Sequence, residues 1–294
     1  AVFNNSLFTI TGANFNSNHE GFYFGTFTEN DFNNFQLNQL GGAFVLKNQN
    51  EKAPWKKVAF AFNYDMANNF NNEYFVAGNS PNSIDQYFVN FANGFVLDEI
   101  SALPGESISD AYFNIGSDPN LGYPALQGFL GFEGFIIDPL SDDPNNTEYA
   151  GNATFTGTVN QDYYVRTFGN DSKFNLNVSG QYTENLFLGM SFNFQGIDRR
   201  RVTEFSESGY DAASTLQDVF FVNDLRTFGS AFSFSVGGIA KLNETIRVGA
   251  SYESPNWFTL TDELFQYLET GVNASGAPST VVVDPNVIFV FPEY

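Results

Sequence analysis

The chain has 294 residues, of which 33 are acidic and 12 are basic, so its formal net charge at neutral pH is −21. Such a charge would repel a phosphate backbone and argues against nucleic-acid binding. Cys is absent, which excludes zinc fingers, iron–sulfur sites, disulfide scaffolds and Cys nucleophiles, and a Ser-His-Asp triad has only His19 to draw on. With 43% apolar and 18% aromatic residues, the chain can bury a large surface and is not expected to be disordered.

The first hundred residues predict β-strands, because large apolar side chains recur at every second position. In one segment Val58, Phe60, Phe62 and Tyr64 alternate with Ala59, Ala61 and Asn63. The candidate strands here are 6–14, 22–28, 36–47 and 56–65. No window holds 18 consecutive apolar residues, so no membrane-spanning helix is expected.

The segment 96–150 reads as a long irregular insert, rich in acidic and turn-forming residues. Loops longer than about 12–15 residues are uncommon in compact domains and are usually functional. Phe129, Phe132 and Phe135 stand out in it, because exposed apolar patches often mark a binding surface. They are interpreted either as an extracellular groove that captures a hydrophobic ligand or contacts a partner, or as the insert's own small core.

The carboxylates of this insert offer oxygen ligands of the kind that Ca²⁺ prefers. They are Asp118, Glu133, Asp138, Asp142 and Asp143. No EF-hand loop surrounds them, so a solvated acidic loop is favoured and no metal site is predicted. No Gly-rich loop is followed by Lys-Ser/Thr, so no phosphate-binding loop is indicated. No cofactor and no catalytic residue is assigned, and the chain is not expected to be an enzyme.

After a further candidate strand at 153–167, the segment 173–195 predicts a hairpin of two long strands joined by the short turn 183–185. Large apolar residues share one face, and small or amide residues share the other. The polar residues that we expect to face a lumen are Asn175, Asn177, Gln181 and Asn193.

The segment 198–227 is expected to be a second long insert, opening with Asp198 followed by Arg199, Arg200 and Arg201. The planar guanidinium group of Arg pairs well with phosphate, so this run is a candidate for binding lipopolysaccharide phosphates at the outer leaflet. The alternative is a solvated loop neutralised by Glu204 and Glu207, and both interpretations stay open.

The segment 228–253 repeats the hairpin design, with a short turn at 242–244. Arg247 and Glu253 fall on its polar face, six positions apart. They are candidates for binding a carboxylate head group or for part of a gate, and a structural ion pair in the lumen is the favoured alternative.

The long strands have about 9–12 residues, which matches the roughly 9–11 that a tilted strand needs to cross a bilayer. Their polar faces carry Asn, Ser, Gly and Gln rather than the Lys, Glu and Thr of a solvated surface. Small polar residues inside and large aromatics outside are typical of a membrane β-barrel with a wet or ligand-holding lumen. A soluble sandwich or jelly roll is the alternative. In a barrel the short turns would face the periplasm and both inserts the exterior.

The run 247–258, Arg-Val-Gly-Ala-Ser-Tyr-Glu-Ser-Pro-Asn-Trp-Phe, resembles a signature of FadL-type outer-membrane transporters. In that family a strand with Arg-x-Gly-x-x-Tyr leads into a Thr/Ser-Pro-x-Trp/Tyr turn. The hairpin at 228–243 and the hairpin at 174–195, with Asn175-Leu176-Asn177 and Leu188-Gly189, are similar to the same family. The likeness covers roughly 170–260 and is weak over 1–150, while the richness in Phe and Asn is like that of members from Bacteroidota-type bacteria.

The resemblance implies a 14-stranded barrel in the bacterial outer membrane, plugged by an N-terminal hatch. It also implies transport of hydrophobic molecules such as long-chain fatty acids or aromatic hydrocarbons. The family's Asn-Pro-Ala-Gly motif before the first strand is absent, and only about eight to ten strands are found. An open edge in hydrocarbon costs several kcal/mol for each unpaired backbone group. We therefore expect 1–294 to be a single barrel domain or a barrel segment, incomplete at both ends or closed by another chain.

The sequence thus favours a passive transporter that takes an apolar molecule from an external groove into a barrel, in contact with outer-membrane lipid. A first alternative is a barrel that does not transport and whose acidic loops dock a protein of a larger envelope assembly. A secreted β-sandwich adhesin is a weaker alternative. A transporter should show a continuous apolar tunnel, and a docking barrel should show a filled lumen with ordered loops.

Overall fold

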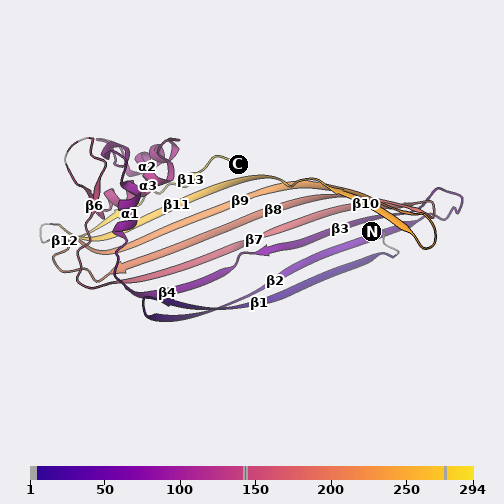
Figure 1. Ribbon diagram of the computed structural model, residues 1–294, viewed down its shortest axis with the longest axis horizontal. Coiled ribbons are helices and arrows are strands. Elements are labelled where there is room, and N and C mark those ends of the chain that lie inside the picture. The colour runs from indigo at the N-terminus through magenta and orange to yellow at the C-terminus, as the bar shows by residue number, and fades with distance from the viewer. Residues whose placement is uncertain (1–4, 142, 144, 275–276) are drawn as a thin grey trace.

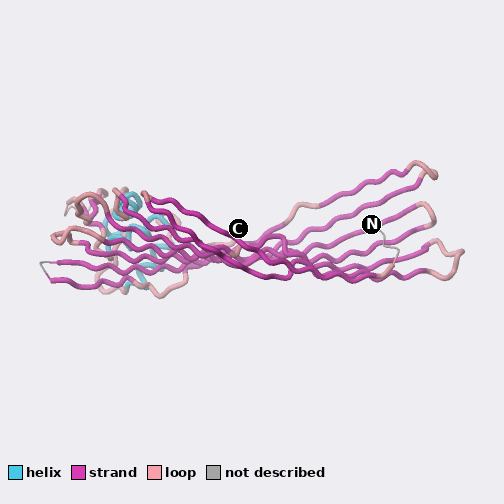
Figure 2. Tube along the Cα trace, turned by 90° about the horizontal axis from the view of Figure 1, so that it is seen from below, coloured by secondary structure: helices cyan, strands magenta, loops and turns pink. Residues whose placement is uncertain are grey.

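The computed structural model describes residues 5–294 except 142, 144, 275 and 276. Strands hold 61% of the chain and helices 12%, so the fold is all-β, as predicted. Figure 1 shows one long twisted sheet with a group of short helices on one face at one end. Seen from below, the sheet is viewed edge-on near its middle, where the strand traces overlap, and it widens toward both ends, which is the effect of a strong twist (Figure 2).

Eleven of the described strands form one antiparallel sheet, in the order β1-β2-β3-β7-β8-β9-β11-β12, with β4, β10 and β13 attached to β7, β9 and β11. Their bounds are β1 (Leu7–Tyr23), β2 (Thr26–Lys47), β3 (Trp55–Asn69), β4 (Asn72–Ser80), β7 (Val159–Tyr182), β8 (Leu186–Ser208), β9 (Leu216–Lys241), β10 (Arg247–Glu253), β11 (Trp257–Ala274), β12 (Ala277–Val283) and β13 (Phe289–Val290). The elements β3 and β4 lie end to end beside β7, and β10 and β11 lie end to end beside β9. Each of these two pairs therefore occupies the position of one very long strand in the sheet.

Both predicted hairpins are confirmed. In β7–β8, Phe174 lies opposite Phe194, and in β9–β10, Val236 lies opposite Tyr252. The candidate segment 22–28 was wrong as a strand, because it contains the β1–β2 turn at Phe24 and Gly25, where φ is 44° and 90°. The candidate 153–167 begins too early, since β7 starts at Val159.

The prediction of a loop insert at 198–227 was also wrong. Strand β8 continues to Ser208 and β9 starts at Leu216, so only the short connection 209–215 leaves the sheet. In this segment charged residues occur on both faces of the sheet, so apolar and polar residues do not alternate along the strands as they do elsewhere. The arginines 199–201 therefore alternate along β8, with Arg200 on one face and Arg199 and Arg201 on the other.

Within the half of the sheet that carries the short turns, the two faces differ in chemistry. One cross-strand row reads Phe62, Leu176, Phe192 and Phe234, and the next reads Ala61, Asn177, Ser191 and Ser235. We call these the apolar face and the polar face. They result from the alternation seen in the sequence, because successive side chains of a strand point to opposite sides.

At the other end, the described residues between 84 and 153 form a helical cap instead of the irregular insert expected at 96–150. Its elements are α1 (Asp85–Ala92), the 3₁₀ turn η1 (Leu97–Glu99), α2 (Ile108–Ser117), α3 (Gly122–Glu133) and the small sheet β5 (Ile137–Pro139) with β6 (Tyr149–Gly151). Helix α2 begins at an N-cap, where the Ser107 hydroxyl accepts the N–H of Asp110 at 3.1 Å.

The hydrophobic core of the molecule lies between this cap and the sheet. Phe88, Tyr112 and Phe129 of the cap pack with Phe221 of β9 and Leu268 of β11. In β9, Phe221 and Ser233 are both odd-numbered, and the β8–β9 register runs without a bulge, so the two residues share a face. The cap therefore lies on the same side of the sheet as the polar face, at the end away from the short turns.

The sheet is open as far as the structure describes it. Strand β1 pairs only with β2 among the described strands, and no pairing joins it to β10, β11 or β12. Across the described residues, no helix has the length and apolar character needed to cross a membrane.

Candidate ligand-binding surfaces

The apolar face forms a band of exposed aromatic and aliphatic side chains. Along β8 it runs from Leu186 to Phe194, about nine residues, which lies within the roughly 9–11 that cross a bilayer at a tilt. Trp55 and Tyr182 form an edge-to-face pair at its short-turn end, with ring centroids 5.3 Å apart. Trp257 lies at its other end, stacked near Phe232.

Beyond the band, charged side chains appear on the same face. Arg226 pairs with Asp198 at 2.7 Å and with Glu263 at 3.3 Å, and Arg200 binds Asp224 at 2.5 Å. Burial opposes the ion-pair effect at Asp198, but the hydrogen bond from Arg226 dominates and lowers the pKa of Asp198. Along β8, this face thus changes from apolar to charged within four residues, from Phe194 to Asp198.

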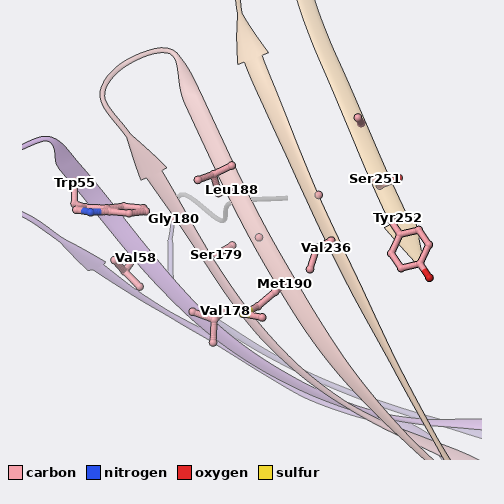
Figure 3. A pocket seen from close by; sticks show the side chains of 13 residues that line it. Trp55, Val58, Val178, Ser179, Gly180, Leu188, Met190, Val236, Ser251 and Tyr252 are labelled. Atoms are coloured by element: carbon pink, nitrogen blue, oxygen red, sulfur yellow. The ribbon is translucent and has the colours of Figure 1, made fainter. Parts of the chain in front are cut away.

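A hollow of about 800 Å³ lies within the apolar band. Trp55 of β3 and Tyr252 of β10 lie at opposite sides of it, and Val178, Leu188, Met190 and Val236 lie between them (Figure 3). The lining is almost entirely carbon, so the hollow suits an alkyl chain or an aromatic hydrocarbon and offers little to a polar solute.

A second hollow, of about 740 Å³, lies on the polar face of the same stretch of sheet. Hydroxyl and amide groups line it, together with three basic side chains, Lys57, Lys241 and Arg247, and with the apolar side chains of Phe187 and Ile239. Several backbone segments line both hollows, among them Gly189 and Gly237. A single layer of sheet therefore separates the apolar hollow from the polar hollow, and at these glycines it has no side chains on either side.

The four polar residues predicted to face a lumen do lie on the polar face, where they form a hydrogen-bonded ladder. Asn175 donates to Asn193 at 2.5 Å, Asn193 donates to the Ser233 hydroxyl at 3.2 Å, and Asn177 donates to the Ser191 hydroxyl at 2.7 Å. Gln181 is buried in the same face. Since closure of the sheet is not seen, their place in a lumen stays a prediction.

Arg247 and Glu253 are both exposed on the polar face, at the two ends of β10. Six residues of a strand that rises about 3.3 Å each separate them by about 20 Å, so they do not form an ion pair with one another. Arg247 lies opposite Lys241 and Glu253 lies opposite Ser235. Of the two, only Arg247 lines the polar hollow.

The three Phe residues of the cap have different environments. Phe129 is fully buried in the core, so it cannot line an exposed groove and instead belongs to the cap's own core. Phe132 is partly buried against that core, and Phe135 is 49% exposed with a φ of 55°. Only Phe132 and Phe135 remain accessible for contact with a ligand or partner.

The acidic residues of the cap are used locally. Glu133 accepts the N–H of Ala102 at 2.8 Å, and Asp118 and Asp143 accept N–H groups of their own turns. Asp142 lies outside the described residues. In the part of the chain that the structure describes, no three His, Cys, Asp or Glu side chains gather in a way that would hold a metal ion.

The run 199–201 does not form a single basic cluster. Arg200 is neutralised by Asp224, while Arg199 lies over the ring of Phe70 at 6.0 Å on the opposite face. Glu207, proposed as a partner of this run, is instead buried under the cap, where it accepts hydrogen bonds from Gln161 and Tyr210. A shared phosphate site for the three arginines is therefore not formed.

Comparison of the chain with protein-family models, with curated proteins and with solved structures finds no match. The resemblance to FadL-type transporters therefore remains an expectation from the strand motifs.

Sequence reasoning missed the contribution of Lys47, Lys57 and Lys241 to the polar face. A count of Lys and Arg near the short turns would have found them, because six of the twelve basic residues lie there: Lys47, Lys52, Lys56, Lys57, Lys241 and Arg247. It also missed the link between cap and sheet, since Ser83 and Glu207 are far apart in sequence.

Proposed function

We propose that this chain forms part of an outer-membrane β-barrel that takes up hydrophobic small molecules without covalent chemistry. The observation that carries the proposal is the apolar hollow, placed in a bilayer-length band and backed by a polar hollow across one layer of sheet. A fatty-acid-like or aromatic ligand would partition into the apolar hollow, gaining about 25 cal/mol per Å² of buried apolar surface. It would then pass the sheet through a lateral gap.

The membrane location is supported by the length of the apolar band and by its borders. Trp and Tyr prefer the membrane interface, and Trp55, Tyr182 and Trp257 lie at the band's two ends. The ion pairs of Arg200 and Arg226 begin just beyond it, where a strand would have left the hydrocarbon.

Closure of the sheet is part of the proposal. In hydrocarbon, the free edges of β1 and β10 would leave backbone N–H and C=O groups unpaired, and membrane strands avoid this by closing into barrels. We therefore propose that further strands, from this polypeptide or from a partner chain, complete the barrel.

A barrel that docks a protein is the second candidate, and the ordered cap favours it. The cap has a packed core and lies on the same side of the sheet as the polar face, which is what a filled lumen with ordered loops would show. Its acidic exposed residues would suit a basic partner surface.

The first experiment is membrane fractionation, followed by gel migration with and without boiling. Retention in the membrane with a boiling-dependent shift supports a closed barrel. Release as a soluble protein, with one gel band that boiling does not change, would reject the membrane location and favour the secreted β-sandwich instead.

Uptake is tested with the protein in liposomes and radiolabelled oleate or naphthalene as probes. Ala250→Phe would fill the apolar hollow and is expected to reduce uptake several-fold. The matched control is Val248→Phe, on the same face of β10 but outside the lining of the hollow. Absence of uptake by the unaltered, membrane-inserted protein would leave the docking function as the better proposal.

A further inference from the structure

Basic residues concentrate at the short-turn end of the sheet, which carries the connections 48–54, 183–185 and 242–246. Half of the twelve Lys and Arg residues lie there, in a chain with 33 acidic residues. The acidic residues in those three connections are Glu51, Glu184 and Glu244. This end is therefore locally positive while the whole molecule is strongly negative.

Two pairs of these basic residues lie directly opposite one another on neighbouring strands. Lys47 of β2 is the cross-strand partner of Lys57 in β3, and Lys241 of β9 is that of Arg247 in β10. Directly opposed side chains have Cβ atoms about 4.5–5.5 Å apart, and like charges in this position destabilise a sheet. Both pairs lie on the polar face.

Among the described residues, no acidic side chain forms an ion pair with Lys241 or Arg247. The ion pairs found among the described residues include Lys56 with Glu184 at 3.8 Å but neither of these two cations. Lys241 instead lies 5.1 Å from the ring centroid of Phe187, which fixes its ammonium over the polar face.

The polar hollow lies between the two pairs. Lys57, Lys241 and Arg247 line it, and none of its described lining residues is Asp or Glu. The hydroxyls of Ser191, Ser235 and Ser251 supply further hydrogen-bond donors. A concave surface with three cations and neutral donors is chemically matched to an anion with several oxygen atoms.

We propose that this hollow binds an oxyanion with two negative charges, that is, a phosphate group. The planar Arg247 guanidinium is suited to two parallel hydrogen bonds to phosphate oxygens, and Lys241 supplies a second charge from the adjacent strand. Binding would convert a repulsive pair into a stabilised one. The phosphate comes either from a free anion or from the head group of an amphiphile whose chain lies along the sheet.

The test is calorimetric titration of the protein in a non-ionic detergent with inorganic phosphate and, separately, with dodecyl phosphate below its micelle concentration. Chloride at matched ionic strength is the reference. Lys241→Gln with Arg247→Gln is expected to weaken binding at least about tenfold, because hydrogen bonds to charged groups are lost. Lys52→Gln with Arg166→Gln is the control, since it removes the same charge from exposed residues outside the hollow.

Thermal unfolding shows whether the variant is folded. Without phosphate at low salt, the Lys241 and Arg247 double variant is expected to unfold at the same or a higher temperature, because a repulsive pair has been removed. Phosphate should raise the unfolding temperature of the unaltered protein and of the control, but not that of the double variant.

Tighter binding of dodecyl phosphate than of phosphate would assign the site to a lipid-like head group, and equal affinities would assign it to a free anion. Phosphate that acts no differently from chloride, or a double variant that binds as well as the unaltered protein, would overturn the proposal. Because the assay needs neither a membrane nor transport, its outcome is independent of the proposed uptake function.

Discussion

Glu207, near the end of β8, accepts a hydrogen bond from the backbone N–H of Ile84 at 3.0 Å, at the start of helix α1. Helix α1 has no side-chain cap of its own at this position, so a residue distant in sequence provides the acceptor. Ser83, Gln161 and Tyr210 also donate to the same carboxylate. Burial, and then the Glu207 charge, raise the pKa of Tyr210, which keeps its hydroxyl protonated as a donor.

Replacing this acceptor should loosen the cap. In Glu207→Gln an amide NH₂ would face groups that already donate, and the expected loss is about 1–3 kcal/mol of unfolding free energy. Hydrogen exchange of the α1 amides should accelerate more than exchange in β8. Glu204→Gln, on the opposite face of β8, is the control. Equal effects of the two substitutions would show that Glu207 does not anchor the cap.

Asp85, in the first turn of α1, should make stability depend on pH. Burial is the largest cause that raises the pKa of Asp85 above its ordinary 3.8, against the lowering effect of hydrogen bonds from the backbone of Ala153 and Gln86. The folded state therefore holds this proton more tightly than the unfolded state does. The contribution of Asp85 to the free energy of unfolding is therefore fully present at pH below about 3.8, and it is lost as the pH rises through the raised pKa of the folded state.

The prediction is checked by urea unfolding between pH 3 and pH 7, comparing the unaltered protein with Asp85→Asn. The variant should gain stability relative to the unaltered protein as pH rises, because it has no charge to bury. Other carboxylates titrate in both proteins, so only the difference between them is interpreted. A difference that does not change with pH would show that Asp85 is not buried in its charged form at neutral pH.

The contact between α1 and α3 requires a residue without a side chain at Gly131. A Cβ added there would lie 2.7 Å from the Cβ of Phe88, which belongs to the rigid base of a buried side chain. Gly131→Ala should therefore cost about 1–3 kcal/mol of unfolding free energy through overpacking, despite the better helix propensity of Ala. Asn90→Ala, at an exposed position of α1, should instead be neutral or slightly stabilising in the same thermal melts.

The half of the sheet with clear alternation could be predicted from sequence. Phe174, Leu176 and Val178 alternate with amides, and the structure pairs them with Phe194, Phe192 and Met190 as the hairpin requires. The second half could not, because charged residues such as Asp198 and Arg200 occupy the face that is apolar further along the same strand. The period of two then no longer separates apolar from polar residues.

The cap was only partly visible in the sequence. Ser107 followed by Asp110 is an N-cap signal, and Leu126, Phe129 and Leu130 have the spacing of one helix face. Its docking depends on Glu207 and on buried amides such as Gln127 with Gln266, which bond reciprocally at 3.1 Å. Such pairs join residues far apart in the chain and leave no local pattern.

The two faces of the sheet should respond differently to charge if the apolar band faces lipid. Met190→Arg places a cation in the band, where it is expected to cost about 2–4 kcal/mol near the bilayer midplane. Ser191→Arg, the next residue on β8 and on the polar face, should be tolerated. Refolding into lipid vesicles, monitored by gel shift, measures both. Equal tolerance of the two substitutions would contradict a lipid-facing band.

The exposed aromatic residues of the cap allow a test of ligand capture. Phe132→Ser with Phe135→Ser should weaken binding of a hydrophobic probe such as radiolabelled oleate in detergent by a few-fold, because these side chains remain accessible on the cap. Phe129→Ser is not a useful probe of capture, because that ring is fully buried and its loss would unfold the cap. Phe113→Ser, an exposed residue of α2, is the control for nonspecific loss of apolar surface. Unchanged affinity in the double variant would assign Phe132 and Phe135 to the packing of the cap alone, and entry of the ligand would then have to begin at the apolar hollow between Trp55 and Tyr252.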